Sequence, residues 1–211
     1  MTLDIRLFLS GPFQNNAYLI ADNNSRSAVV IDPSFDSEVI LEEAQKNNLK
    51  IEEIWLTHAH FDHFAGTKVI ALANHPPLPV RLHPADLDLW RTGGNAKSFG
   101  QIFDQGPEPS LEFSDGQKLK IGQIKFEVCS TPGHTLGHVV IYCRQAQALF
   151  CGDVIFRGSI GRTDLPGGDF ETLIDSIHSK VLTLPDETRL LPGHGPESTV
   201  GIEKAENPFL A

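Results

Sequence analysis

Cysteine is scarce in this 211-residue sequence, which contains three, Cys129, Cys143 and Cys151. All three lie in or beside apolar runs, and an odd, small number does not supply a disulfide framework. We therefore expect buried, reduced thiols that pack as small core residues, and a cytoplasmic location. Cys151 lies two residues before Asp153, but we expect it to be a core residue and not a metal ligand.

Positive charge is also in short supply. Lys and Arg total 17 against 27 Asp and Glu, which gives a formal net charge of −10. A nucleic-acid-binding surface needs clustered basic residues to neutralise phosphates, so we expect no nucleic-acid partner. The N-terminal stretch MTLDIRLFLSGP carries Asp4 and Arg6 and does not resemble a signal peptide, and no window approaches ~18 consecutive apolar residues. The sequence therefore predicts neither a membrane span nor a membrane partner.

With 40% hydrophobic residues the chain can bury a full core, and we expect one domain over residues 1–211. Short apolar runs bounded by Gly, Pro and Asn indicate strands. These runs cover residues 5–10, 16–22, 27–32, 52–57, 80–83, 117–121, 124–131, 138–143, 148–153 and 188–193. Helical spacing is present at 34–48, 65–75 and 169–184. Strands interleaved with helices predict an α/β or α+β class with a large sheet content.

Three finer expectations concern these elements. The buried face of the first helix is expected to contain Val39, Ile40 and Ala44, and that of the last helix Phe170, Leu173, Ile177 and Val181. Residues 188–193 are expected to form the last strand. Residues 84–116 are rich in Gly and Pro and are the least regular part, which is typical of a lid or binding loop.

Histidine and aspartate are concentrated in one stretch, WLTHAHFDHFAG, at residues 55–66. Side chains two positions apart on an extended segment point the same way, so His58 and His60 can converge at the end of a strand. Asp62 and His63 follow where the chain turns toward a helix. Four ligands this close in sequence do not suit a single tetrahedral site, but they suit two neighbouring metals.

Three further candidates each follow an apolar strand and a turn that contains glycine. KFEVCSTPGHT contains His134, ALFCGD ends with Asp153, and TRLLPGHGP contains His194. Ligand crevices of open sheets form beyond the C-terminal ends of strands. Because a carboxylate has two oxygens, Asp153 can bridge two cations. The candidates then divide into two sets that share Asp153: His58, His60 and His134 for one metal, and Asp62, His63 and His194 for the second.

Nitrogen and oxygen ligands without thiolate suit Zn, Fe or Mn, so we expect two divalent metal ions as cofactors, with zinc favoured. The remaining histidines are not expected to be ligands. His138 is expected to hydrogen-bond near the site, and His83 to cap or line the expected lid. His75 and His178 are expected to have no role in the site.

The motifs THAHFDH, TPGHTLGH, CGD and PGHGP together resemble the metallo-β-lactamase fold superfamily in order and spacing. The resemblance implies a four-layer αβ/βα sandwich, in which two mixed β-sheets are flanked by helices and the metals lie at one edge. GSIGRTDLPGGD and PGHGPESTVGIEKAENPFL resemble the compact glyoxalase II-like hydrolases, whose binuclear centre cleaves glutathione thioesters such as lactoylglutathione. The same seven residues then carry over as metal ligands, with Asp62, Asp153 and His194 acting in catalysis.

In that reading a water held between two cations loses its proton near neutral pH and attacks the thioester carbonyl. The sequence has no serine elbow motif that would supply another nucleophile. Two alternatives stay open: a mononuclear Fe(II) persulfide dioxygenase acting on glutathione persulfide, and a non-catalytic metal-binding module. β-Lactamases of this fold resemble the sequence less, because they lack the bridging aspartate that Asp153 supplies. Oxygen-reducing di-iron relatives have Glu where this chain has His60.

The expected partner is a small-molecule thioester, such as one derived from glutathione, and the oligomeric state is left open. Arg157 and Arg162, in the segment RGSIGRTD, are the candidates for binding a substrate carboxylate. Arg162 has a structural alternative, a salt bridge with Asp164 or Asp169.

Overall fold

The structure is a computed structural model that describes residues 3–210. Six strands form one sheet, called sheet A, in the order β1-β2-β3-β4-β5-β6. They are β1 (Leu3–Ser10), β2 (Asn15–Asp22), β3 (Ser27–Ile31), β4 (Lys50–Trp55), β5 (Val80–Leu82) and β6 (Leu111–Glu112). Strands β1 to β3 are antiparallel and β3 to β6 are parallel, so sheet A is mixed.

A second six-stranded sheet, called sheet B, has the order β14-β13-β10-β9-β8-β7. Its strands are β7 (Lys118–Ile121), β8 (Ile124–Ser130), β9 (Val139–Cys143), β10 (Ala148–Gly152), β13 (Arg189–Pro192) and β14 (Ser198–Thr199). It is also mixed, because β10 and β13 are parallel whereas the other neighbours are antiparallel. Strands β11 (Ile155–Phe156) and β12 (Ser159–Ile160) form a separate two-stranded ribbon.

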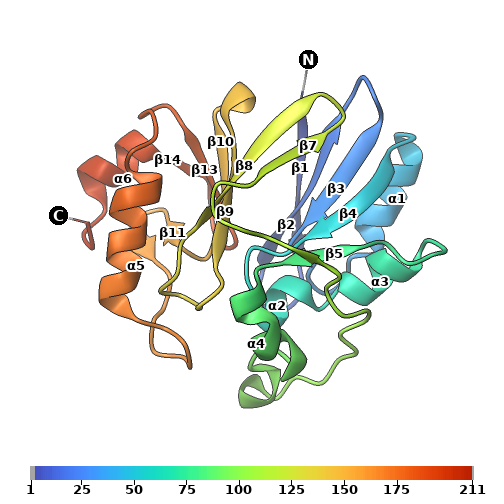
Figure 1. Cartoon of the computed structure of the whole chain (residues 1–211), viewed down its shortest axis with the longest axis horizontal. Helices are drawn as coiled ribbons and strands as arrows, with labels where there is room; N and C mark the ends of the chain where they lie inside the picture. The colour runs from blue at the N-terminus through green and yellow to red at the C-terminus, as the bar shows by residue number, and fades with distance from the viewer. Residues whose placement is uncertain (1–2, 211) are drawn as a thin grey trace.

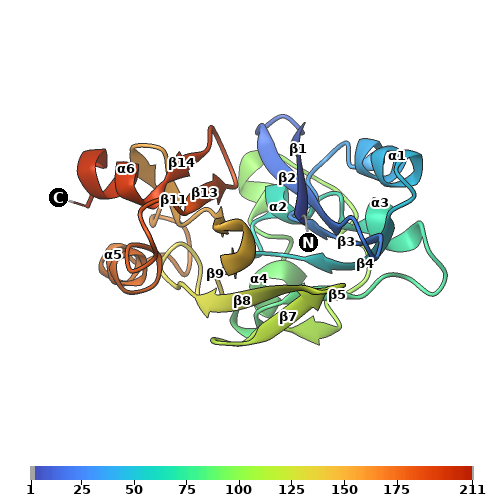
Figure 2. The ribbon, with the colours of Figure 1, turned by 90° about the horizontal axis from the view of Figure 1, so that it is seen from above.

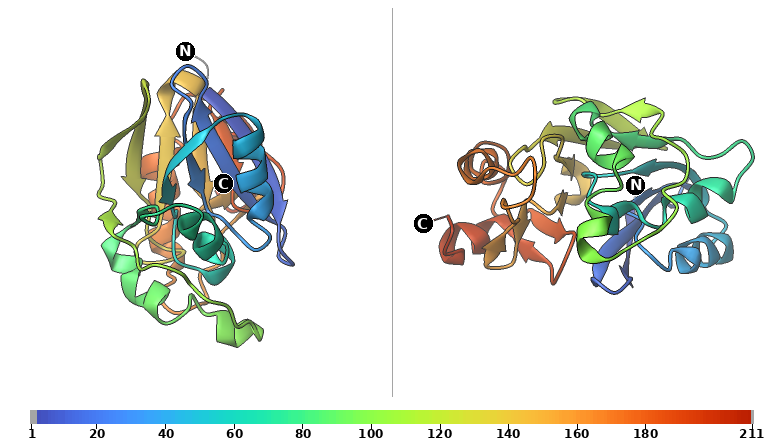
Figure 3. Two further views of the ribbon diagram at one scale, coloured as in Figure 1. Left: turned by 90° about the vertical axis from the view of Figure 1, so that its right-hand side faces the viewer. Right: turned by 90° about the horizontal axis from the view of Figure 1, so that it is seen from below.

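Helices lie outside the two sheets (Figures 1 and 2). Helices α1 and α3 lie on the side of sheet A, and α5 and α6 lie on the side of sheet B, as the view from below in Figure 3 also shows. The α-helices are α1 (Glu38–Lys46), α2 (Phe61–Phe64), α3 (Thr67–Leu72), α4 (Leu87–Arg91), α5 (Phe170–Ser176) and α6 (Val200–Glu206). Turns of 3₁₀-helix are η1 (Pro84–Asp86), η2 (Ala96–Phe99) and η3 (Arg144–Ala146), and η4 (Ile177–Val181) is a turn of π-helix. Among residues 3–210, none of the helices has the length and apolar character needed to cross a bilayer.

The central strands β2, β3, β9 and β10 are buried on both of their faces. In β2, Leu19 packs on the side of α1 and α3, whereas its neighbour Tyr18 packs between the two sheets. In β10, Phe150 packs between the sheets and Leu149 packs on the side of α5. Strands buried on two faces have continuous apolar sequences. This is why these segments could be identified as strands although their sequences do not alternate between apolar and polar residues. The layer order confirms the predicted four-layer αβ/βα sandwich of two mixed sheets.

Several finer expectations were wrong. Val39 and Phe170 are each 46% exposed, whereas Ile40 and Leu173, which were expected on the same two faces, are buried. The helix expected after Gly168 is α5 continued by the wider turn η4. Strand β13 is followed by β14 and α6, so it is not the last strand. The expected lid also contains regular structure, η1, α4, η2 and β6.

Candidate metal centre

The seven candidate ligands lie in loops and one short helix that follow strands of both sheets. His58 and His60 follow β4, and Asp62 and His63 lie on α2. The other three come from sheet B, where His134, Asp153 and His194 follow β8, β10 and β13. In the described part of the chain, three groups have ligand atoms within 4.8 Å of one another, and one of them combines Asp32 with His58 and His63. The other two are His58, His60 and His134, and Asp62, His63 and His194. These are the two sets into which the sequence divided the candidates.

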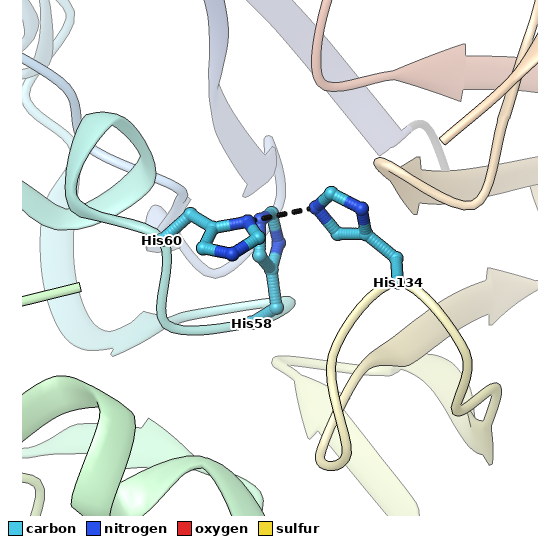
Figure 4. Close-up of side chains that lie close together, drawn as sticks. All are labelled: His58, His60 and His134. Atoms are coloured by element: carbon cyan, nitrogen blue, oxygen red, sulfur yellow. Dashed lines mark hydrogen bonds between the residues drawn. The ribbon is translucent and has the colours of Figure 1, made fainter. Parts of the chain in front are cut away.

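The first group is made of three buried imidazoles. His60 Nδ1 lies 2.8 Å from His134 Nε2, and the rings point toward one another across the gap between the two loops (Figure 4). The ring centroid of His58 lies 5.0 Å from that of His60 and 4.8 Å from that of His134. Three ring nitrogens therefore face one small volume.

The second group adds a carboxylate to two imidazoles. Asp62 Oδ2 lies 3.3 Å from His194 Nε2 and 3.8 Å from His63 Nε2. Asn15 Nδ2 donates a hydrogen bond to Asp62 Oδ2 at 3.0 Å, which fixes the carboxylate on this side. This group is closer to solvent than the first, because the side chain of His194 is 28% exposed.

Asp153 lies between the two groups. Its Oδ1 is 3.3 Å from His63 Nε2, and its Oδ2 is 3.6 Å from His194 Nε2 and 3.7 Å from His134 Nε2. Gly193 permits this close packing, because a Cβ at that position would lie 2.3 Å from Asp153 Oδ1 and 2.5 Å from His63 Cε1. The carboxylate thus faces ligand atoms of both groups.

Fixed partners orient the rings of His58 and His63. The hydroxyl of Thr57 donates to Asp32 Oδ2 at 2.6 Å, so its oxygen can accept from His58 Nδ1–H at 3.0 Å. His63 Nδ1–H donates to the same Asp32 oxygen at 3.1 Å. In both rings Nε2 is thereby directed toward the other candidate ligands, and such outer hydrogen bonds are typical of metal-binding histidines. Asp32 also lies near His58 and His63 as a possible ligand, but its oxygens are engaged by Thr57 and His63.

Backbone carbonyls orient two more rings in the same way. His134 Nδ1–H donates to the carbonyl of Arg162 at 2.8 Å, and His194 Nδ1–H donates to that of Phe13 at 3.1 Å. His138 accepts the backbone N–H of Asp153 at its Nε2, 3.1 Å away, so it supports the centre as expected and does not face it as a ligand. The predicted capping role of His83 is also met, because its Nδ1 accepts the N–H of Ala85.

Two carboxylates that support the centre were not found from the sequence. Asp32 ends the run SAVVID just as Asp153 ends ALFCGD, and that likeness was the available signal. Asp86 lies in the expected lid and gave no signal. It is 1% exposed and accepts hydrogen bonds from the backbone of Ala59 and from Thr135 and Gly137. Asp86 therefore joins the loop of His58 and His60 to the loop of His134.

Burial makes the first group neutral at physiological pH. It lowers the pKa of His60 to about 3, with a further lowering by nearby His134. It also lowers the pKa of His58 well below its usual value, and lowers that of His134. Neutral imidazoles are the form that binds a cation.

The second group is an array of ion pairs. Burial alone would lower the pKa of His63, but Asp153 and Asp62 raise it well above its usual value. The pKa of His194 is raised as well, because Asp153 and Asp62 outweigh its burial. Burial opposes the ionisation of Asp62, yet His63 and His194 hold its pKa at about 2. His63 and His194 similarly hold the pKa of Asp153 well below its usual range, against strong burial.

The residues fit a pair of divalent cations. Nε2 of His58 is buried without a hydrogen-bond partner, and Nε2 of His63 and Oδ1 of Asp153, which lie 3.3 Å apart, have only each other. A buried polar atom is costly to leave unpaired, and a bound cation would satisfy these three. The donor set is nitrogen and oxygen, which suits zinc, iron or manganese. Cys151, two residues before Asp153, is a core residue and not a candidate ligand, since its thiol is fully buried and donates to the carbonyl of Leu149.

A cavity of about 370 Å³ opens over the centre. Arg162 lines it, as predicted for a substrate contact, but its guanidinium is held by Asp164 through two bonds of 2.7 Å. The predicted salt bridge is therefore present, and a role for Arg162 in binding substrate stays a prediction. Arg157 is exposed and is not one of the lining residues.

The sandwich fold and the clustered His and Asp side chains are those of a metallo-hydrolase. The family description "Metallo-beta-lactamase superfamily" matches residues 10–194, and the chain belongs to this superfamily. Hydroxyacylglutathione hydrolase GloC of Haemophilus influenzae is 34% identical over 223 residues, covering 99% of this chain and 98% of that protein.

Two solved structures are similar over almost their whole length. The crystal structure of TTHA1623 in a di-iron-bound form is 41% identical, with a TM-score of 0.88 over 97% of this chain and 100% of that one. The crystal structure of the BLEG-1 B3 metallo-beta-lactamase is 36% identical, with a TM-score of 0.91 over 98% of this chain and 99% of that one.

Proposed function

We propose that the protein is a binuclear metal-dependent hydrolase that cleaves a thioester of the lactoylglutathione type. The observation that carries the proposal is the position of Asp153, whose two oxygens face ligand atoms of both groups. A shared carboxylate is what a site for two adjacent cations needs, and a single cation would leave one group without a function. The likeness to GloC over nearly the whole chain supports the choice of a thioester.

His58, His60 and His134 would hold one divalent cation and Asp62, His63 and His194 a second, with Asp153 between them. Bound there, the cations would lower the pKa of a water toward ~7 and would polarise the carbonyl oxygen of the substrate. Asp62 is ionised at neutral pH, so it can accept a hydrogen bond from the attacking water and orient it. Asn15 fixes Asp62 in this position. His194, at the solvent side of the centre, borders the cavity that the substrate enters. The leaving group is a thiolate, which needs no protonation to depart, so no further acid is required of the chain.

The test measures metal content and turnover on one preparation. The purified protein is expected to hold about two divalent metals per chain and to release thiol from S-lactoylglutathione. A preparation with one Fe(II) per chain that consumes oxygen with glutathione persulfide, and releases no thiol from the thioester, would replace the proposal by the dioxygenase alternative.

A β-lactam is the second substrate class to be tested, because the similar BLEG-1 structure is described as a B3 metallo-beta-lactamase. Both reactions add water to a carbonyl group, and they differ in the leaving group. A chromogenic cephalosporin assayed beside the thioester separates them, and we expect the thioester to be the better substrate by kcat/KM.

A further inference from the structure

We propose that the cavity over the metal centre is an acyl-binding pocket for an aromatic or similarly bulky apolar group; this inference rests on the proposed function and narrows its substrate. Six apolar side chains line the cavity: Phe13, Phe61, Phe99, Phe156, Ile160 and Leu165. A polar hydroxyacid such as a lactoyl group needs no wall of this kind.

Three of the phenylalanines form one continuous aromatic surface. The ring centroid of Phe13 lies 5.2 Å from that of Phe61 and 6.1 Å from that of Phe99, in edge-to-face geometry. Phe61 and Phe99 are 5.5 Å apart. These rings come from the β1–β2 turn, α2 and η2, three separate segments that converge beside Asp62. An added aromatic group can pack on such a surface in the same edge-to-face way.

A second apolar surface comes from the β11–β12 ribbon and the segment after it. Phe156 packs its ring edge-on to His194, with centroids 6.2 Å apart, and Ile160 is 9% exposed. The two surfaces approach each other at the rim, where the guanidinium of Arg162 lies 6.0 Å from the ring centroid of Phe99. Apolar surfaces therefore lie on more than one side of the candidate metal-ligand atoms.

The scarcity of charged groups to pair with a charged substrate indicates that the apolar surfaces of the cavity contact the acyl group. Among the lining residues that the structure describes, Arg162 is the one Lys or Arg, and Asp164 already neutralises it at the rim. The thiol half of a biological thioester carries a polar or charged tail, which this interior cannot match but the rim and solvent can. The acyl half is then the part that remains for the apolar walls.

The experiment compares two glutathione thioesters that differ in one group. S-Mandeloylglutathione has a phenyl ring where S-lactoylglutathione has a methyl, and the thiol is the same. Burial of the added ring is expected to raise kcat/KM on the order of 10- to 100-fold, after correction for the rates of hydrolysis in buffer. Phe99→Ala should lower kcat/KM for the mandeloyl ester ~5- to 20-fold and that for the lactoyl ester less than about twofold.

Ile102→Ala is the matched control for Phe99→Ala. Ile102 lies in the same segment, is 96% exposed and borders a different cavity, so this variant should change neither rate. Equal kcat/KM values for the two esters, or an equal loss of both in Phe99→Ala, would overturn the acyl pocket and leave the thioesterase proposal intact.

A binding measurement keeps the two proposals apart. Calorimetry on the metal-loaded protein should show mandelate binding about tenfold more tightly than lactate, with a more negative heat-capacity change. This preference should be lost in Phe99→Ala. If neither ester is hydrolysed, the proposed function fails, and the mandelate-to-lactate comparison still decides whether the cavity selects an aromatic group. Equal binding of the two acids would overturn that selection.

Discussion

Replacing Asp86 with alanine is expected to loosen both loops that carry the first metal group. The Asp86 carboxylate accepts the N–H of Ala59 at 3.0 Å, the hydroxyl of Thr135 at 2.7 Å and the N–H of Gly137 at 2.6 Å. Ala59 lies between two candidate ligands, and Thr135 follows a third.

The size of the effect follows from the donors that lose their partner. Asp86→Ala leaves two buried backbone N–H groups without an acceptor, and each costs about 1–3 kcal/mol. The free energy of unfolding should therefore fall by about 2–6 kcal/mol, and Tm by roughly 5–20 °C. Asp86→Asn keeps one carbonyl oxygen and should give a smaller loss. The measurement is thermal unfolding of the metal-free protein, so that a change in metal binding does not enter.

Metal binding supplies the second readout and the control. Because the loops are no longer fixed relative to each other, Asp86→Ala should weaken zinc binding about 10- to 100-fold, as loss of other supporting partners does. Asp88→Asn, two residues along and with a side chain that is 94% exposed, should change neither Tm nor zinc affinity. Wild-type Tm and zinc affinity in Asp86→Ala would refute the role assigned to this carboxylate.

Three further predictions concern the ligands and the rim. Asp153→Ala should reduce the metal content below two per chain and the rate by more than about 100-fold while the fold is kept, as metal analysis and circular dichroism can check; full activity would exclude a shared ligand. Arg162→Ala should raise KM for a glutathione thioester about tenfold with a smaller change in kcat, whereas a loss of folding shared with Asp164→Asn would make the pair structural. Because the pKa values of His63 and His194 are raised, protons compete for the second site below those pKa values. Lowering the pH from 8 to 6 should therefore release one metal before the other in equilibrium dialysis, and simultaneous release would contradict this reading.

Much of the fold was predictable because its central strands are buried on both faces. Runs such as SAVVID and ALFCGD have no polar alternation to obscure them, and the sites after them gave Asp153, His134 and His194. The structure brings all seven candidates together, and their action as ligands stays a prediction. A metal ligand needs a nitrogen or oxygen atom at a suitable position after a strand. Both the residue type and its spacing from the strand can be read from the sequence.

The supporting residues could not be found in the same way. Asp86 reaches its partners across 27 and 51 positions of sequence, and nothing in the segment PADLD marks it as buried. The aromatic surface likewise forms only when three distant segments fold together, so Phe13 and Phe99 had no pattern in common. Val39 was assigned to a buried face because helical spacing gives a direction, but it does not give the width of the face that a sheet covers.

The central claim is that one shared carboxylate joins two metal sites into a single hydrolytic centre. Titration of metal-free protein with zinc, with thiol release from a thioester followed at each addition, tests it most directly. The account predicts little activity up to one equivalent per chain and a rate that rises until two equivalents are bound. A rate that reaches its maximum at one equivalent and does not change with the second would contradict it.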